Sequence, residues 1–424
     1  MNVWIFQTGE PIHSDRGFPR PMRAINLTNA LVEAGHHVTL WSSGFNHLEK
    51  KHRSKVFRKI TINNFLDIWL IPSYGYSSHI GLKRLIDHAK IAWNLRKILL
   101  EITTKPNVAF VGYPPIEFAW VAIKWLSAKK VPVMLDAKDQ WPHIFTESTP
   151  RFLRPLARVI LLPYFWLGQD AMRRATAFCS MSSAFLNWMK NFSGRPLTPM
   201  DCVVPLSPMQ ENFTDEVLKE ANDWWRCRGV FDDGRKRFFF VGSVSRAFDF
   251  APIIYAARHA FESGLNWQFV ICGNVTKAPR VVEAFSGLSN VIFPGWIDRP
   301  KIAALAHLST FGLAPYKNTD DFNASIPNKV IDYLSLGKPI IGSLGGEVAT
   351  LLKQYEVGYS YSATDLLGFL NIVNNSCEDP QKIATLSANA IALYDNIFCG
   401  EKVYTGLVNR LIELSAFNLN NDQT

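Results

Sequence analysis

A lysine and an aspartate stand three residues apart in the segment 325–342, which reads Ser-Ile-Pro-Asn-Lys-Val-Ile-Asp-Tyr-Leu-Ser-Leu-Gly-Lys-Pro-Ile-Ile-Gly. Pro327 suits the first turn of a helix, which puts Asn328 and Lys329 at its positively polarised start. An ammonium group there can meet a phosphate. Asp332 follows one turn later on the same face and can accept hydrogen bonds from two ribose hydroxyls. The spacing therefore predicts a nucleotide site.

A second helix start follows closely. Gly345, Gly346 and Glu347 come directly after the apolar run that ends at Gly342, and they open another predicted helix. A glycine-flanked helix start can bind an anion through its exposed backbone amides. We expect the two helix starts to face one cleft and to grip a diphosphate together.

A third feature is the turn after the apolar run 237–242. Gly242 lets a ligand approach the backbone, and Ser243 and Arg246 add a hydroxyl and a cation that can hold a pyrophosphate. Gly273 ends the next apolar run in the same way. A plain strand-to-helix turn would also look like this, so both interpretations stay open.

Elements that position these residues alternate between strands and helices. In the first half, short apolar runs predict strands at 2–7, 36–41, 67–71, 108–112 and 132–136. Apolar residues at helical spacing predict helices from about 21 to 34, at 82–100 and at 116–128. Gly9 and Gly17 lie in the long basic loop after the first strand. This pattern indicates a parallel sheet covered on both faces, whose ligands bind at the carboxyl ends of the strands.

The second half repeats the pattern, so two domains are expected. Residues 193–237 are predicted to be polar and irregular, with a domain boundary near 200. Strands are then expected at 237–242, 267–273, 290–293, 310–314, 339–342 and 358–361, and helices at 249–263, 379–396 and 400–416. We predict domains at 1–200 and 201–400, and a helix and tail at 401–424 that cross back to the first domain.

Charge is divided unevenly between the halves. Residues 1–200 carry 26 Lys and Arg against 12 Asp and Glu, a net of +14, whereas residues 201–424 carry 19 against 24, a net of −5. A basic half suits an anionic partner such as a phosphorylated substrate or a membrane surface. We find no nucleic-acid-binding signature and no cluster of metal ligands. Six cysteines without a CxxC pair, and no signal peptide, predict a cytoplasmic protein with reduced thiols.

The segment 150–175 differs from the rest of the first half. Apolar and aromatic residues are interleaved there with arginines, and Pro155 and Pro163 interrupt any single helix. This composition is typical of a segment at a membrane interface. A helix packed between the domains is the alternative, and the sequence does not separate the two. No transmembrane span is expected, because the strongest apolar run covers only 159–168.

The motif 327–342 followed by Gly345-Gly346-Glu347 resembles the nucleotide-sugar site of retaining glycosyltransferases of family 4, of the bacterial surface-polysaccharide type. The turn 240–243 and the segment 270–273 match in the same order, and so does Leu-Asp-Ala-Lys-Asp-Gln-Trp-Pro-His at 135–143. The resemblance spans the whole chain. It implies the GT-B fold, in which two Rossmann-like doubly wound α/β domains face each other across a cleft.

The resemblance also implies roles for individual residues. The second acid of the family's paired-acid motif, which binds the donor ribose, corresponds to Asp332. The first acid falls at Ala324, where Asp321 or Asn323 could substitute. The remaining implied residues bind the donor pyrophosphate or sugar (Gly9, Gly17, Gly242, Ser243, Arg246, Gly273, Asn328, Lys329, Gly345, Gly346 and Glu347) or face the acceptor (Arg20, Asp139 and His143). Of these, Asp139, Arg246 and Lys329 are the expected catalytic residues.

We therefore expect a metal-independent transfer of a sugar from a nucleotide-sugar to a glycan acceptor linked to polyprenyl diphosphate, at the inner face of the cell membrane. The product would be a cell-surface polysaccharide such as O-antigen or capsule. Two other hypotheses remain. One is a nucleotide-sugar epimerase of the same double-sheet plan, and the other is a non-catalytic glycosyltransferase-like subunit, which the departure at Ala324 keeps open.

Overall fold

The chain folds into two compact units in the computed structural model, which describes residues 1–16, 20–78, 81–147, 149–276, 278–376 and 379–421. The first unit comprises Met1–Met209 together with the segment that begins at Gly400. The second unit comprises Gln210–Cys399. The C-terminal segment thus belongs to the unit that begins the chain.

The first unit is built on an eight-stranded sheet with the order β10-β9-β8-β7-β1-β2-β6-β5, in which only the edge strand β5 runs antiparallel to its neighbour. All five predicted strands are present. The sequence did not predict β5, β9 and β10 or the small pair β3 and β4, because an exposed edge strand and short strands lack a long apolar run. The strands are β1 (Asn2–Phe6), β2 (His37–Ser43), β5 (Arg58–Asn63), β6 (Leu66–Ile71), β7 (Val108–Tyr113), β8 (Val133–Ala137), β9 (Ala177–Ser180) and β10 (Cys202–Val203), beside a small pair β3 (Phe45–Asn46) and β4 (Lys51–His52).

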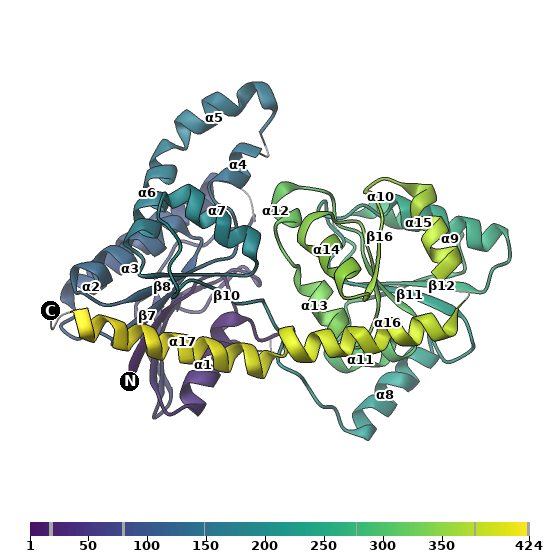
Figure 1. Ribbon diagram of the computed structural model, residues 1–424, viewed down its shortest axis with the longest axis horizontal. Coiled ribbons are helices and arrows are strands. Elements are labelled where there is room, and N and C mark those ends of the chain that lie inside the picture. Colours follow the sequence, from purple (N-terminus) through teal and green to yellow (C-terminus); the bar gives the residue numbers. More distant parts are fainter. Residues whose placement is uncertain (17–19, 79–80, 148, 277, 377–378, 422–424) are drawn as a thin grey trace. The chain divides into compact units, whose positions relative to one another are not determined.

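Helices cover both faces of this sheet. One face is covered by α1 (Arg23–Glu33) and α17 (Gly400–Asn421), which lie side by side (Figure 1). Buried Leu407, Leu411 and Leu414 recur on one side of α17, which explains why this helix packs there. The other helices are α2 (Leu82–Glu101), α3 (Ile116–Ala128), α4 (His143–Glu147), η1 (Arg151–Leu153), α5 (Arg154–Ile160), α6 (Leu162–Arg174) and α7 (Ser183–Ser193), of which α2, α3, α6 and α7 pack on the opposite core.

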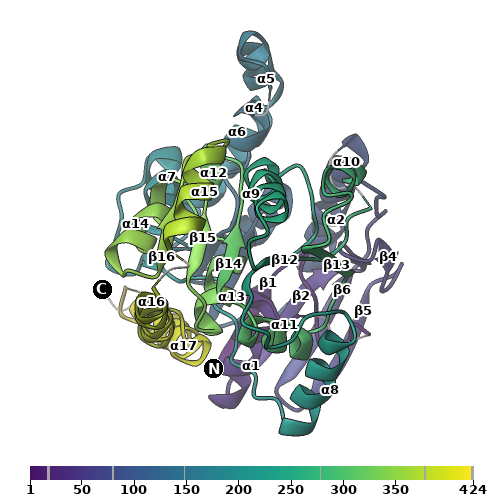
Figure 2. The same ribbon diagram turned by 90° about the vertical axis from the view of Figure 1, so that its right-hand side faces the viewer.

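The second unit has a six-stranded sheet with the order β13-β12-β11-β14-β15-β16, parallel throughout. All six predicted strands are present. The order reverses between β11 and β14, and ligands of such sheets bind outside the carboxyl ends at that point. Figure 2 shows β14 and β15 next to each other in this sheet. The strands are β11 (Lys236–Val241), β12 (Trp267–Cys272), β13 (Val291–Gly295), β14 (Phe311–Ala314), β15 (Ile340–Gly342) and β16 (Gly358–Ser360).

One prediction for this part of the chain is wrong. Residues 193–237 are not irregular throughout, because α8 (Asp215–Arg226) forms within them. Thr214 caps this helix, two acids lie in its first turn, and Trp225 is fully buried. The other helices are α9 (Ala251–Glu262), α10 (Pro279–Ala284), α11 (Arg299–His307), α12 (Asp320–Asn323), α13 (Asn328–Ser335), α14 (Gly346–Gln354), α15 (Leu366–Ser376), α16 (Pro380–Leu393) and η2 (Tyr394–Phe398).

Candidate active site

Two helix starts lie at the carboxyl edge of the second sheet. α13 follows β14 through the segment 315–327, which contains the short helix α12, and α14 follows β15 after three residues. Because β14 and β15 are parallel neighbours, both helices begin at the same edge of the sheet. The predicted start of the second helix at Gly346 is confirmed. Pro327 is the residue that precedes α13 rather than its first helical residue.

Lys329 extends from the first turn of α13 to the end of β11. The backbone of Gly242 has a φ of +147°, and a Cβ atom on this residue would lie 1.9 Å from Nζ of Lys329. The same ammonium lies 4.9 Å from the ring centroid of Phe240 and 5.1 Å from that of Phe248. The absent side chain at Gly242 therefore provides the space that the ammonium occupies, at the point where the strand order reverses.

Tyr333 fixes α13 against two strands. Its hydroxyl accepts a hydrogen bond from the backbone N–H of Val241 at 3.1 Å and donates one to the carbonyl of Leu313 at 3.2 Å. Gly312 makes room for the ring, since a Cβ there would lie 2.5 Å from it. Asp332 lies one turn after Lys329, on the same helical face. The sequence motif thus places Lys329 and Asp332 on a helix that Tyr333 anchors to the ends of β11 and β14.

Gly273 packs against the end of the neighbouring strand. A Cβ on Gly273 would lie 2.1 Å from the carbonyl oxygen of Gly242, and its own φ is +127°. The amide of Gly242 donates to the carbonyl of Cys272 at 2.9 Å. Gly273 therefore allows the ends of β11 and β12 to approach closely. Gly273 therefore has a packing role, which helps to hold Gly242 in place at the predicted site.

The start of α14 lies against Asn323. A Cβ on Gly346 would lie 2.1 Å from the backbone carbonyl oxygen of Asn323, and one on Gly345 would lie 3.5 Å from its Oδ1. This side-chain oxygen is shielded from solvent and accepts no hydrogen bond from another described residue. Glu347 lies in the first turn of α14. Of the two residues considered as substitutes near Ala324, Asn323 is therefore the one in contact with the glycine-rich helix start.

The turn after β11 is longer than a tight strand-to-helix turn, because α9 begins only at Ala251. Phe248 pairs with Tyr316 across an isolated bridge, which joins this turn to the loop after β14. The side chains of Ser243 and Arg246 are exposed. Among described residues, Arg246 makes no hydrogen bond or ion pair. Both residues lie in the turn that follows β11, and within the described part of the chain no contact fixes the Arg246 guanidinium near Lys329.

In the first unit, Asp139 follows β8 at the carboxyl edge of the sheet. Burial raises the pKa of its carboxyl group, and the cations Arg84 and Lys138 oppose this rise. Arg84 itself lies 4.9 Å from the ring centroid of Trp141. Among the described residues, no backbone N–H at the start of α4 donates a hydrogen bond to the Asp139 carboxyl group, so Asp139 does not cap this helix. A carboxyl group with a raised pKa at a strand end can accept a proton.

The sequence did not predict a buried network of charges that includes Lys138, the neighbour of Asp139. Arg23 and Asp136 form an ion pair at 3.1 Å with fully buried side chains. Lys138 lies 3.5 Å from Asp136 and forms a close ion pair with Glu10. Burial alone would lower the pKa of the Arg23 guanidinium, but the Asp136 carboxylate raises it well above its usual value. An acid inside the apolar run 132–136 was the available signal, because a buried carboxylate needs a cationic partner.

Glu10 connects this network to the loop after β1. Its second carboxylate oxygen accepts a hydrogen bond from the N–H of Ala24 at 2.8 Å, in the first turn of α1. Arg23 also donates to the carbonyl of Val204 at 2.6 Å. The ends of β1 and β8 and the start of α1 are thus joined through charged side chains. This network holds the segment that carries Asp139.

The remaining predicted residues of the first unit do not gather in one place. His143 is enclosed by the rings of Phe165, Trp188 and Phe192, and the indole N–H of Trp188 donates to its Nδ1 at 3.3 Å. This environment favours a packing role for His143. Gly9 adopts a φ of +79° and Arg20 is exposed, while Gly17 lies outside the described residues.

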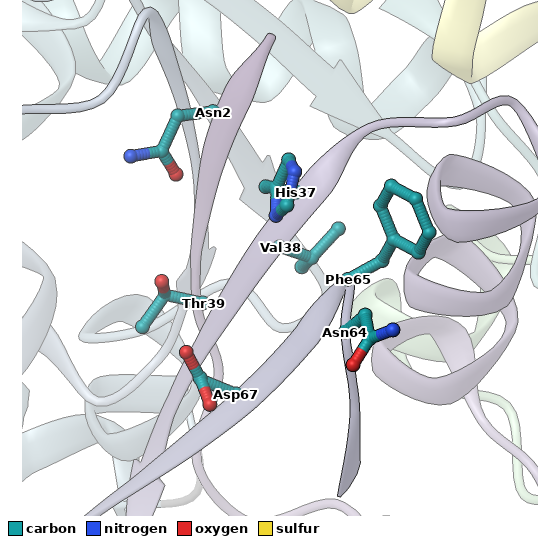
Figure 3. A pocket seen from close by; sticks show the side chains of 7 residues that line it. All are labelled: Asn2, His37, Val38, Thr39, Asn64, Phe65 and Asp67. Atoms are coloured by element: carbon teal, nitrogen blue, oxygen red, sulfur yellow. The ribbon is translucent and has the colours of Figure 1, made fainter. Parts of the chain in front are cut away.

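A shallow hollow lies elsewhere in the first unit, toward the amino-terminal ends of β1, β2 and β6 (Figure 3). It contains none of the predicted site residues and lies away from the carboxyl ends at which parallel sheets bind ligands. Across the part of the chain that the structure describes, no group of three or more His, Cys, Asp and Glu side chains could hold a metal ion. The hollow is lined by Asn2, His37, Val38, Thr39, Asn64, Phe65 and Asp67.

Comparison with known sequences gives two matches. Residues 235–379 match the family model described as Glycosyl transferases group 1. A protein of Bacillus subtilis (strain 168), whose name assigns it to teichuronic acid biosynthesis as glycosyltransferase TuaH, is 27% identical over 152 residues. That alignment covers 35% of this chain and 37% of the relative, so the chain spans little more than a third of the relative's length.

Solved structures resemble the chain over nearly its whole length. Sucrose-phosphate synthase from Thermosynechococcus elongatus superimposes with a TM-score of 0.72 at 13% identity, covering 98% of this chain and 99% of that one. HepE from Anabaena in complex with UDP gives 0.64 at 13% identity, covering 97% and 99%. WaaG, a glycosyltransferase involved in lipopolysaccharide biosynthesis, gives 0.63 at 12% identity, with 97% and 99% coverage. The fold of the chain is therefore GT-B, and a group 1 glycosyl transferase domain matches residues 235–379 of its second unit.

Proposed function

We propose that the chain is a retaining glycosyltransferase that transfers a sugar from a nucleotide diphosphate sugar to a glycan acceptor. The observation that carries this proposal is the Lys329 ammonium, held over Gly242 where the strand order reverses, next to two helix starts on adjacent strands. Relatives of the same fold support it, since HepE is described in complex with UDP and with UDP-glucose.

On the donor side, charge compensation is the main requirement. The departing nucleoside diphosphate gains negative charge in the transition state, and fixed cations and helix starts stabilise it without a metal ion. Lys329 and the first amides of α13 and α14 would serve this purpose, with Arg246 approaching from its exposed turn. Asp332 would bind the ribose hydroxyls. We further propose that Asn323 takes the place of the acid missing at Ala324, because its unpartnered oxygen lies against Gly345.

On the acceptor side, Asp139 is the proposed base. The acceptor hydroxyl attacks the anomeric carbon on the face from which the diphosphate departs, so the configuration is retained. Its proton passes to Asp139, or Asp139 orients the hydroxyl while the departing phosphate oxygen takes the proton. The raised pKa of Asp139 suits it to accept a proton in the transition state.

The acceptor is proposed to be a glycan linked to polyprenyl diphosphate, used in the synthesis of a cell-surface polysaccharide at the inner face of the membrane. Two observations support this: the net charge of +14 over residues 1–200, and the names of TuaH and WaaG, which refer to teichuronic acid and lipopolysaccharide biosynthesis.

Incubation with radiolabelled nucleotide-sugars and lipid-linked oligosaccharides tests this function. We expect a labelled lipid-linked product whose new linkage has the anomeric configuration of the donor, and undiminished activity in EDTA. Isomerisation of a UDP-sugar without an acceptor would instead indicate an epimerase. Binding of the donor without transfer or hydrolysis would indicate a non-catalytic subunit, the second candidate that Ala324 keeps open.

A further inference from the structure

Large apolar side chains gather on the outside of one short helical segment. Helix α5 and the preceding turn η1 contribute no buried residue at all. The side chains that face solvent continue into the first turns of α6 and are exposed by 81% (Phe152), 57% (Leu156), 62% (Val159), 67% (Ile160), 59% (Leu162) and 58% (Trp166). We call these six residues the apolar tip.

The apolar tip is not part of the core of its own unit. A helix packed inside the protein would bury one face, whereas α5 buries none within its unit. Figures 1 and 2 both show α5 projecting from the rest of the first unit. Scattered exposed apolar residues are ordinary, but six large ones within the single projecting segment 152–166 mark a surface that another phase or molecule covers.

Charge around the apolar tip has one sign. Arg151, Arg154 and Arg158 are interleaved with the apolar residues, and no Asp or Glu occurs between Glu147 and Asp170. Arg154 is held by the chain itself, since it donates to the carbonyls of Glu147 and Thr149. Arg151 and Arg158 are exposed. An apolar surface with only positive charge around it is complementary to anionic lipid.

We propose that the apolar tip inserts into the surface of an anionic lipid bilayer and anchors the protein there. This inference rests on the proposed function insofar as a lipid-linked acceptor would lie at that surface. A second copy of the chain is a poorer partner, because joining two tips would bring their arginines together without a compensating acid. No helix among the described residues is long and apolar enough to cross a membrane, and a helix as short as α5 can only lie within the interface.

Vesicle flotation with the full-length protein tests the anchor. One set of vesicles contains phosphatidylcholine alone, and the other also contains phosphatidylglycerol. The apolar variant carries Phe152→Ser, Leu156→Ser and Ile160→Ser. The charge variant carries Arg151→Gln and Arg158→Gln. Matched controls change exposed residues of the second unit: Phe261→Ser, Leu265→Ser and Leu367→Ser for the first, and Lys219→Gln with Lys353→Gln for the second.

We expect the wild type to float with anionic vesicles and to bind neutral vesicles at least tenfold more weakly. The apolar variant should lose binding to both. The charge variant should lose about 25-fold in binding to anionic vesicles, about fivefold for each arginine, and nothing on neutral ones. Both controls should bind like the wild type. Failure of the wild type to float with anionic vesicles would overturn the proposal, as would equal loss in the controls.

The outcome for the anchor is independent of the outcome for the proposed function. Stabilisation by nucleotide-sugar is measured on the same variants and should match the wild type. If the wild type does not float but binds a nucleotide-sugar, the anchor is contradicted and the proposed function is supported. If the wild type floats but binds no nucleotide-sugar, the anchor is supported and the proposed function is contradicted. Concentration-dependent dimerisation that requires the apolar tip, without vesicle binding, would replace the membrane with a second copy.

Discussion

A Cβ atom on Gly242 would lie 1.9 Å from the ammonium nitrogen of Lys329. The two residues are far apart in the chain, and each is part of a separate motif. Their contact joins the end of β11 to the start of α13. It explains why a glycine is needed at the strand end, and it makes the position of the ammonium dependent on a residue that carries no chemistry of its own.

Gly242→Ala should therefore displace Lys329 and weaken donor binding. Loss of a charge-assisted hydrogen bond costs about 1.5–3 kcal/mol, so affinity for the nucleotide-sugar should fall by about one to two powers of ten, as measured by isothermal titration calorimetry. Gly81→Ala is the matched control, because Gly81 has nearly the same φ, +144° against +147°, but nothing lies within 4 Å of the added Cβ. Equal weakening in both variants would show that backbone strain alone causes the effect.

Lys329→Ala should reduce turnover by about two to three powers of ten, the range for loss of one fixed transition-state donor. The melting temperature should change little, because Lys329 is only partly buried. Lys329→Arg should restore little activity, since the larger guanidinium does not fit the space over Gly242. Lys353→Ala, an exposed lysine in the last turn of α14, serves as the control. Parallel loss of activity and stability in Lys329→Ala would argue for a structural role instead.

The contacts of Lys329 mark the limit of what the sequence could predict. The helical spacing of Lys329 and Asp332 predicted that they share one face, and Gly242 and Gly273 predicted the ends of β11 and β12. Both predictions were possible because they rest on patterns that are local in the sequence. The contact between Gly242 and Lys329 depends on β14 being inserted next to β11, which only the three-dimensional topology decides. For the same reason, the sequence could offer both Asp321 and Asn323 as substitutes for the missing acid, but it could not show that Asn323 contacts Gly345 and Gly346.

The activity should depend on pH through Asp139. Burial raises the pKa of this carboxyl group, so a base at this position loses its proton only above the usual range for aspartate. The rate should therefore rise with pH through this raised pKa, and Asp139→Asn should lower the rate by about 10²-fold or more and abolish that acidic limb. A pH–rate profile of kcat/KM checks this. An unchanged limb in the asparagine variant would assign it to another group.

Stability should respond to the same substitution in the opposite direction. A carboxyl group whose pKa is higher in the folded than in the unfolded state contributes stability below the unfolded pKa, and this contribution is lost as the pH rises through the folded pKa. At neutral pH the ionised Asp139 therefore carries a cost of burial, and Asp139→Asn should melt no lower than the wild type. A clear fall in melting temperature at neutral pH, absent at acidic pH, would contradict this.

The buried pair of Arg23 and Asp136 should be essential for stability. Asp136→Ala would leave the guanidinium buried without its counterion, which costs about 3–5 kcal/mol, read as a lower midpoint of urea unfolding. Replacing both residues, with Arg23→Met and Asp136→Leu, should recover much of this loss. Glu413→Ala, which breaks the exposed pair with Arg410, should cost no more than about 0.5 kcal/mol. If Asp136→Ala and Glu413→Ala lowered the free energy of unfolding by similar amounts, the buried pair would not be essential for stability.

The fold was predictable further than the site. Continuous apolar runs in β1, β7, β8, β11 and β12 give strands that are buried on both faces, and such runs survive in the sequence as local signals. Helix α8 was missed because its apolar face is narrow and its surface is charged. The environment of His143 could not be predicted either, since its three aromatic neighbours come from α6 and α7, well beyond the segment 135–143 that suggested a role at the acceptor.

The central claim is that the second unit binds a nucleoside diphosphate through Lys329 and the starts of α13 and α14. The most direct measurement is the melting temperature of the wild type and of Lys329→Ala with UDP-, GDP- and dTDP-sugars. A ligand at about 100 times its dissociation constant stabilises the folded state by about 2.7 kcal/mol. We predict a clear rise for the wild type with one class of nucleotide-sugar, and a much smaller rise for the variant. No rise with any nucleotide-sugar, or an equal rise in the variant, would contradict the claim.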